Sequence, residues 1–210
     1  MNEIKSVEQV KNTENLAVYI DRCGLVVKKE TLKTISEVLG IPYNPLSPGA
    51  GFDSVGWRSV VKCLDNEHVY HILMIGEGCR EFEKYLLSQG MDWNLFFEKI
   101  LEYEVKIRRI NLAIDDQQKV YNISDLLKRA KRGVFNQKIS VDYDGSTDER
   151  IITLGSIQSN LLMKFYERYN MNRYEFKFRE KQAMKIVQES IKGNDLLSIA
   201  KEFLHDVFPE

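Results

Sequence analysis

The chain has 210 residues, of which 43% are hydrophobic and 29% are charged, and its net charge is −1. This length allows one large domain with a sizeable core, and the longest apolar runs are too short to span a membrane. The polar N-terminus has no apolar signal segment, and the three cysteines lack the paired spacing of zinc sites or disulfide frameworks. We therefore predict a cytoplasmic protein.

The first half of the chain alternates strand-like and helix-like segments after an expected flexible tail at residues 1–15. The spacing of the apolar residues defines these segments, and glycine and proline mark the breaks between them. In order, the segments are a strand at 16–27, a helix at 28–40, a long loop at 41–56, a hairpin of strands at 57–64 and 68–76, and helices at 78–90 and 92–103.

The second half is richer in strands. It holds a strand at 105–115, a basic helix at 122–133, strands at 138–144, 150–155, 161–168 and 173–180, and helices at 181–191 and 194–208. This order predicts an α+β fold, with an antiparallel sheet that has helices on one face and a charged catalytic face on the other. We divide the chain into an N-terminal α/β part at 16–104, a catalytic sheet region at 105–185 and a C-terminal helix region at 186–210.

The small net charge hides an uneven distribution. Residues 1–104 hold 11 Lys and Arg against 16 Asp and Glu, residues 105–185 hold 17 against 10, and residues 186–210 hold 2 against 5. A basic central segment between acidic ones is typical of a protein in which one surface meets phosphate. Chance patchiness of a charged surface is the alternative.

Three of the predicted strands have one apolar face and one ionisable face, because residues two apart in a strand share a face. The apolar faces hold Ile110, Leu112 and Ile114, then Leu161, Met163 and Phe165, then Tyr174, Phe176 and Phe178. The ionisable faces hold Arg109, Asn111 and Asp115, then Lys164, Tyr166 and Arg168, then Arg173, Glu175, Lys177 and Arg179. If the three strands share a sheet, these ionisable groups collect on one side, where each must pair with another or with a ligand. A face that is only solvated would carry more Ser and Thr.

Such a face predicts phosphoryl transfer. A tyrosine hydroxyl, with an ordinary pKa of about 10, is a weak nucleophile at neutral pH. Neighbouring cations, here Lys164 and Arg168, favour the phenolate and neutralise a phosphodiester. Asp115 and Glu175 can hold Mg²⁺ or Mn²⁺ through oxygen ligands, and the metal polarises the phosphate. We predict that Tyr166 attacks DNA and forms a phosphotyrosyl link that conserves the bond energy for rejoining.

Five short segments resemble a known family. RRINLAIDD, GSIQSNLLMKFYER and NRYEFKFRE, in that order, resemble the rolling-circle replication initiators of Gram-positive plasmids. They are closer still to the related relaxases of integrative conjugative elements, the replication initiation factor family. GAGFDSVGWR and IGEGCREFE in the first half are similar to that family as well. The likeness covers most of residues 16–190.

The resemblance implies sequence-specific nicking of a single DNA strand at an origin, by a tyrosine that becomes joined to the 5′ phosphate. It also implies a divalent cofactor, Mg²⁺ or Mn²⁺, with Asn111 as a third candidate ligand. By position, Tyr166 takes the place of the nucleophile, while Asp115 and Glu175 take the places of two acids. The implied partner is DNA, single-stranded or as a supercoiled origin, and a host helicase is a candidate second partner.

The chain departs from the family pattern at three positions. Asn111 stands where an aspartate is usual, and because an amide oxygen adds no charge, we expect weaker metal affinity. Arg168 replaces a lysine and cannot act as a proton donor, since its pKa is too high. Ile157 replaces a frequent arginine and removes one phosphate contact. Family members commonly run past this length, so we expect either a fragment or a truncated product that lacks part of the C-terminal region.

Further residues are candidates for DNA binding. The cations in question are Arg109, Arg173, Lys177 and Arg179 on the sheet, and Lys128, Arg129, Lys131 and Arg132 on the basic helix, for which a solvated face is the alternative. Gly76 and Gly78 precede a helix whose N-terminal amides could hold a phosphate, although a tight turn explains them equally well. Trp57 and Trp93 could stack on bases, but core packing is the more frequent role.

Two other functions fit the same residues. A catalytically silent DNA-binding remnant is suggested by Asn111, Ile157 and the short length. A metal-dependent nuclease would use Asp115 and Glu175 to activate water, with Tyr166 as a bystander. A covalent protein–DNA adduct would separate the nicking relaxase from both.

Overall fold

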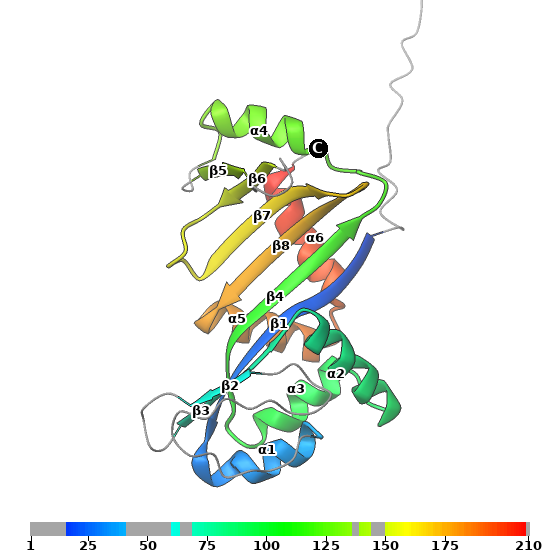
Figure 1. The fold of residues 1–210 in the computed structure, drawn as a ribbon, viewed down its shortest axis with the longest axis vertical. Coiled ribbons are helices and arrows are strands. Elements are labelled where there is room, and N and C mark those ends of the chain that lie inside the picture. The colour runs from blue at the N-terminus through cyan, green and yellow to red at the C-terminus, as the bar shows by residue number, and fades with distance from the viewer. Residues whose placement is uncertain (1–15, 41–59, 64–68, 136–138, 144–149, 209–210) are drawn as a thin grey trace, which may run out of the picture.

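The computed structural model describes residues 16–40, 60–63, 69–135, 139–143 and 150–208 (Figure 1). The expected tail at 1–15, the loop at 41–56 and Trp57 lie outside the described residues. Within the described ranges, one antiparallel sheet combines with α-helices, so the predicted α+β class is confirmed. None of the described helices is long and apolar enough to cross a membrane.

The sheet contains eight strands in the described part of the chain, and all neighbours pair in antiparallel fashion. Their order across the sheet is β2-β3-β1-β4-β8-β7-β6-β5. The strands are β1 (Leu16–Lys28), β2 (Val60–Cys63), β3 (Val69–Ile75), β4 (Lys106–Asp116), β5 (Ile139–Tyr143), β6 (Arg150–Leu154), β7 (Leu161–Arg168) and β8 (Met171–Arg179). All eight match strands expected from the sequence, with shifts of a few residues at their ends.

The helices also fall where the spacing of apolar residues predicts them. A 3₁₀ turn, η1 (Lys29–Thr31), leads into α1 (Leu32–Val38). The others are α2 (Glu77–Ser88), α3 (Trp93–Leu101), α4 (Ile123–Lys131), α5 (Glu180–Ile191) and α6 (Leu196–Val207). Asp92 caps α3 by accepting a hydrogen bond from the Leu95 amide at 2.9 Å, which satisfies one of the unpaired N–H groups of the first turn.

The strand β1 joins the two halves of the chain. It pairs with β4 along nearly its whole length and with β3 through its second half. The sheet therefore continues from the part at 16–104 into the part at 105–185 without a break, as Figure 1 shows. The boundary placed between residues 185 and 186 in the sequence analysis lies inside helix α5.

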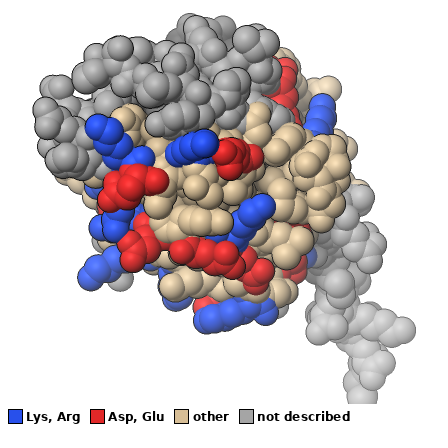
Figure 2. Space-filling model, turned by 90° about the horizontal axis from the view of Figure 1, so that it is seen from below, with Lys and Arg blue, Asp and Glu red and all other residues tan. Residues whose placement is uncertain are grey.

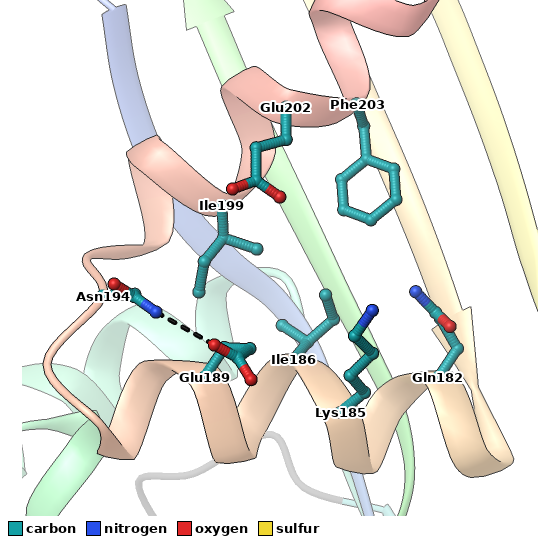
Figure 3. Close-up of a pocket in the computed structure, with 8 residues that line it drawn as sticks. All are labelled: Gln182, Lys185, Ile186, Glu189, Asn194, Ile199, Glu202 and Phe203. Atoms are coloured by element: carbon teal, nitrogen blue, oxygen red, sulfur yellow. Dashed lines mark hydrogen bonds between the residues drawn. The ribbon is translucent and has the colours of Figure 1, made fainter.

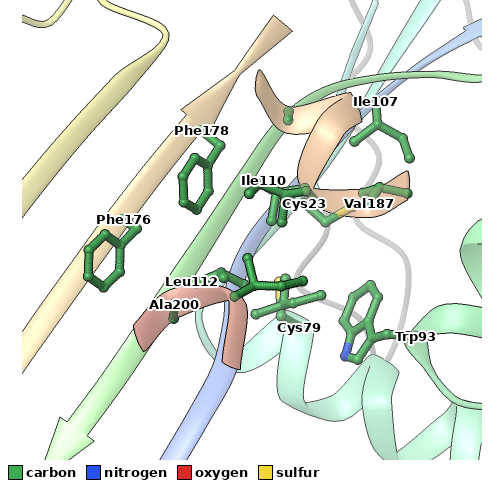
Figure 4. Packing of buried hydrophobic residues seen from close by; sticks show 14 of the residues in the cluster. Cys23, Cys79, Trp93, Ile107, Ile110, Leu112, Phe176, Phe178, Val187 and Ala200 are labelled. Atoms are coloured by element: carbon green, nitrogen blue, oxygen red, sulfur yellow. The ribbon is translucent and has the colours of Figure 1, made fainter. Parts of the chain in front are cut away.

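The core lies between the apolar face of the sheet and the helices packed on it, and α5 and α6 cover this face over the central strands. Ile110, Leu112, Phe176 and Phe178 point into it and are at most 1% exposed. Phe203 of α6 packs on Phe178 with a ring-centroid distance of 5.0 Å. Figure 4 shows these strand side chains beside the helices. Because α5 and α6 cover this face, the ionisable side chains of the same strands lie on the opposite one (Figure 1).

A β-bulge interrupts the pairing of β1 with β4. Ile20 pairs with Leu112 and Arg22 pairs with Asn111, so Asp21 is the extra residue between them. The backbone N–H of Gly76 donates to the carbonyl of Asp21 at 2.7 Å, which holds the start of α2 at the bulge. Bulges re-aim side chains and are frequent beside functional sites.

One end of the molecule carries mixed charge. Figure 2 shows that end, with acidic and basic side chains intermixed over the described surface. A mixed surface attracts a polyanion weakly.

Candidate active site

The strand register brings the ionisable residues of β4, β8 and β7 onto one face. Asp115 lies opposite Arg173, which in turn lies opposite Tyr166. Lys164 lies opposite Glu175 on the same face. Because directly opposite side chains in an antiparallel pair are neighbours, carboxylates and cations alternate across the three strands.

The hydroxyl of Tyr166 donates a hydrogen bond to Glu175 Oε1 at 2.6 Å. Burial and this bond raise the pKa of Tyr166 above its ordinary value. The charge of Arg168 favours the phenolate, as expected, but desolvation and the carboxylate of Glu175 outweigh it, so the pKa rises overall. The hydroxyl stays protonated and points at a proton acceptor.

Glu175 is suited to accept that proton. Burial alone would raise the pKa of Glu175, but the hydrogen bond from Tyr166 and the charge of Lys177 outweigh burial and lower it. The Lys177 ammonium lies 3.3 Å from Glu175 Oε2. Glu175 is therefore ionised at neutral pH and holds Tyr166 on one oxygen and Lys177 on the other.

The second carboxylate of the site, Asp115, is held by two partners. Arg173 Nε donates to Asp115 Oδ1 at 2.8 Å, and the Tyr19 hydroxyl donates to Oδ2 at 2.8 Å. Burial raises the pKa of Asp115, the charge of Glu175 adds to the rise, and Arg80 and Arg168 oppose it. Residues of two other strands, β1 and β8, thus fix this carboxylate of β4.

The three expected metal ligands do not form a ready metal centre. Asp115 and Glu175 have both oxygens engaged by protein donors. Asn111 is 3% exposed, and its oxygen accepts from Arg109 Nε at 3.0 Å. No group of three or more His, Cys, Asp or Glu side chains suited to a metal occurs among the described residues. Metal binding would require these donors to move.

Three residues near the site were missed by sequence reasoning: Tyr19 and Asp21 on β1, and Arg80 on α2. Arg80 lies 4.0 Å from Asp21 and stacks over the Tyr19 ring at 4.2 Å. Burial and the charge of Glu175 raise the pKa of Asp21. Extending the period-two rule to the segment LAVYIDRC would have placed Tyr19 on the ionisable face, but the bulge at Asp21 leaves no comparable mark in the sequence.

Three of the cations expected to contact DNA have partners within the protein. Arg173 is 6% exposed and bonded to Asp115, so it is an internal ion pair and not an open phosphate contact. Lys177 is held by Glu175. Arg179 donates to the carbonyl of Ile157 and so fastens the turn before β7.

Arg109 differs from these three. Burial and the positive charges of Arg22 and Arg179 lower its pKa to about 10. A group of cations that repel each other gains from a bound anion, so this end of the face stays a candidate phosphate contact. Lys164 and Arg168 are half-buried beside Tyr166 and remain the expected neighbours of the reacting phosphate.

The four cations of the basic helix separate into two groups. Arg129 donates to the carbonyl of Val207 at 2.6 Å and packs on Phe135, so it ties α4 to α6. Lys128, which pairs with Asp125 at 2.9 Å, is exposed, as are Lys131 and Arg132. The exposed three remain candidates.

Two other candidate binding features have structural roles. Trp93 is 5% exposed and packs against Phe82 and Phe96, so it belongs to the core and cannot stack on bases. Gly76 precedes α2 with φ of 50°, a left-handed conformation that favours glycine, which explains the glycine at this strand-to-helix turn. Gly78 is buried in the first turn of the helix.

A separate cleft of about 300 Å³ lies between α5 and α6. Figure 3 shows its walls, where Lys185 and Glu189 of α5 face Glu202 and Phe203 of α6. These helices cover the apolar face of the sheet, so the cleft lies on the side opposite Tyr166. It takes no part in the site.

Comparison with known proteins identifies the fold and the family. Residues 53–99 match the family described as Rolling Circle replication initiation protein N-terminal domain. Over 166 residues, 68% of this chain, the sequence is 31% identical to the Bacillus subtilis (strain 168) protein named "Putative DNA relaxase NicK". The chain spans about half (47%) of that relative's length. The fold matches the solved structure of a rolling circle replication initiator protein from Geobacillus stearothermophilus, with a TM-score of 0.64 and 20% identity over 85% of this chain and 80% of that one. The chain therefore belongs to the family of rolling-circle replication initiators and relaxases that its motifs resemble.

Proposed function

We propose that this chain nicks one strand of DNA through Tyr166, forms a 5′-phosphotyrosyl intermediate and rejoins the strand. The observation that carries the proposal is the 2.6 Å hydrogen bond from the Tyr166 hydroxyl to Glu175 on a sheet face lined with cations. A hydroxyl nucleophile paired with a general base is the arrangement that covalent catalysis needs. Membership of a family of initiators and relaxases supports the same reaction.

In the proposed reaction Glu175 acts as the general base. The phenol enters protonated, because its pKa is raised, and Glu175 takes the proton as the phenolic oxygen attacks phosphorus. The Tyr166 O–P bond forms while the bond from phosphorus to the 3′ oxygen breaks. The 3′ oxygen leaves as a hydroxyl after taking a proton from Lys177, whose pKa is lowered by burial. Resealing is the reverse, with attack by the 3′-hydroxyl on the phosphotyrosine.

Lys164 and Arg168 support this chemistry electrostatically. They flank Tyr166 on β7 and take no part in the proposed proton transfer. The attacked phosphate gains negative charge as the fifth oxygen approaches. Fixed cations stabilise that charge, and such stabilisation is commonly the largest single contribution to catalysis.

Dependence on Mg²⁺ or Mn²⁺ is a further part of the proposal. Asp115 and Glu175 would hold the ion, which would polarise the phosphate when bound. The ion would have to displace Arg173 or Lys177 from these carboxylates, while Asn111 keeps its bond to Arg109. We expect a Mn²⁺ titration to raise the thermal midpoint of the wild-type protein, and an equal rise in Asp115→Asn would remove Asp115 as a ligand.

A plasmid experiment tests the function. Supercoiled plasmid carrying the DNA that flanks this gene is incubated with protein and Mn²⁺, quenched in detergent and analysed for protein attached to nicked DNA. The proposal predicts an adduct with the wild type and none with Tyr166→Phe. Cleavage without an adduct that survives in Tyr166→Phe would instead indicate the metal-dependent nuclease. DNA binding with neither cleavage nor adduct would indicate the silent remnant.

A further inference from the structure

Arg80 lies at the charged sheet face although it belongs to a helix. It is in the first turn of α2, and its guanidinium carbon lies 4.2 Å from the centroid of the Tyr19 ring. Gly76 is bonded to the backbone of Asp21 at the bulge, which places this turn at the edge of β1. The helix thus adds a cation to the site from outside the central strands.

The ring under Arg80 is firmly held. The Tyr19 hydroxyl donates to Asp115 at 2.8 Å, and the Arg173 guanidinium carbon lies 5.2 Å from the same ring. A cation over the face of an aromatic ring is attracted by the π electrons of the ring, and this attraction uses none of the N–H donors of a guanidinium.

Arg80 is less engaged than the other cations near Asp115 and Glu175. Arg173 and Lys177 each bond to a carboxylate and have side chains that are 7% and 16% exposed. The Arg80 side chain is 42% exposed, and its contact to Asp21 at 4.0 Å is too long for a hydrogen bond. Among the described residues, its guanidinium therefore keeps its donors available.

We propose that Arg80 binds a phosphate of the DNA strand that Tyr166 attacks, through two N–H donors of its stacked guanidinium. The inference rests on the proposed function and deepens it, because it names the residue that positions the strand. The planar fork of arginine matches two oxygens of a phosphate, and charge-assisted pairs of this kind are among the stronger hydrogen bonds. The Tyr19 ring under Arg80 bonds to Asp115, and Arg173, which bonds to the same carboxylate, lies opposite Tyr166 in the sheet, so a short series of contacts connects Arg80 with Tyr166.

The test measures coupling between Arg80 and single phosphates. Single-stranded oligonucleotides that tile the DNA flanking the gene are screened on Tyr166→Phe protein, which cannot cleave, and the tightest binder is selected. Versions with one uncharged methylphosphonate at each successive position are then titrated against this protein and against the same protein with Arg80→Gln. At one phosphate we expect the methylphosphonate to weaken binding about tenfold or more when Arg80 is present, and to have no effect with Arg80→Gln.

Two matched variants separate this contact from general charge and from misfolding. Lys84→Gln removes one positive charge from an exposed residue one turn further along α2, and it should leave the scan unchanged. Arg80→Lys keeps the charge but loses the planar fork, so most of the coupling should disappear while the thermal midpoint stays the same. If Arg80→Lys keeps the full effect of the methylphosphonate on binding, the phosphate is not held by two N–H donors of Arg80.

The outcomes distinguish failure of this inference from failure of the proposed function. If each methylphosphonate weakens binding equally with and without Arg80→Gln, Arg80 does not bind a phosphate. An adduct formed by the wild type on plasmid DNA would still support nicking in that case. Coupling at one phosphate without any adduct from the wild type would overturn nicking and keep Arg80 as a phosphate-binding residue. Failure of every oligonucleotide to bind would overturn both.

Discussion

Two tyrosine–carboxylate pairs lie on opposite faces of the same sheet. Tyr166 donates to Glu175 at 2.6 Å on the ionisable face, and Tyr174 donates to Asp116 at 2.5 Å on the face covered by helices. Burial raises the pKa of both hydroxyls. The hydrogen bond itself therefore does not distinguish a nucleophile from a structural tyrosine.

The surroundings of the two pairs make the difference. Tyr174 and Asp116 are 0% exposed, and the Tyr174 ring packs against Tyr121 and Phe165 with centroid distances of 5.8 Å. No ion pair involves Asp116 among the described residues, and a phosphate could not reach it. Tyr166 is half-buried and has Lys164, Arg168 and Lys177 nearby. Access and positive charge make Tyr166 the candidate nucleophile.

The largest effect is expected from Tyr166→Phe. The change removes the attacking oxygen, so adduct formation should fall below detection, by more than about 1000-fold. DNA affinity should remain nearly unchanged, because the hydroxyl contributes little to phosphate binding. A gel assay for adducts and a fluorescence titration measure the two quantities. An adduct formed at the wild-type rate would remove Tyr166 from the mechanism.

Glu175→Gln tests the general base and should have the next largest effect. At pH 7 we expect the rate of adduct formation to fall about 10²- to 10⁴-fold. Because the pKa of Glu175 is lowered, the base is fully ionised at neutral pH, and the wild-type rate should be flat between pH 6 and about 8. In Glu175→Gln the phenol must ionise unaided, so the rate should rise about tenfold per pH unit. Identical pH profiles would contradict the assignment.

Tyr174→Phe is the matched change on the other face. It leaves the buried Asp116 Oδ2 with only the bond from the Tyr121 amide at 3.3 Å, so the free energy of unfolding should fall by about 1–3 kcal/mol. Urea unfolding followed by circular dichroism measures this change. The adduct yield per folded molecule should equal that of the wild type. Loss of the adduct in a fully folded Tyr174→Phe protein would erase the distinction between the two faces.

The smallest effect concerns the exposed cations of α4. Replacing Lys131 and Arg132 by Gln should flatten the salt dependence of single-strand binding, with a change in slope of up to about 1.4 and no loss of stability. Arg129→Gln is the control, because it breaks the bond to Val207 and should lower the thermal midpoint without changing the slope. An unaltered slope in the double variant would remove α4 from the DNA interface.

Much of the site could be predicted because strands alternate with a fixed period. That rule placed Tyr166, Glu175 and Asp115 on one face, and the register then brings them together. The partners of each side chain could not be predicted in the same way. Whether a cation meets a phosphate or a neighbouring carboxylate depends on distances across strands, and Arg173 turned out to be an internal ion pair for this reason.

Features that depend on long-range geometry left no pattern in the sequence. The bulge at Asp21 arises from the mismatch of two strands that are about 90 residues apart in sequence, and the stacking of Arg80 on Tyr19 depends on where α2 begins. The rise in the pKa of Tyr166 could not be foreseen either, since it follows from burial and from the bond to Glu175. The charge of Arg168 lowers this pKa, as the sequence suggests, but burial and the Glu175 carboxylate outweigh it.

The most direct test of the central claim is to identify the residue that carries DNA. The adduct is digested with nuclease and trypsin, and the nucleotide-bearing peptide is sequenced by mass spectrometry. We expect a nucleotide attached through its 5′ phosphate to the peptide at residues 165–168, on Tyr166. A nucleotide on Tyr19 or any other tyrosine, or nicked DNA without a nucleotide-bearing peptide, would contradict this expectation.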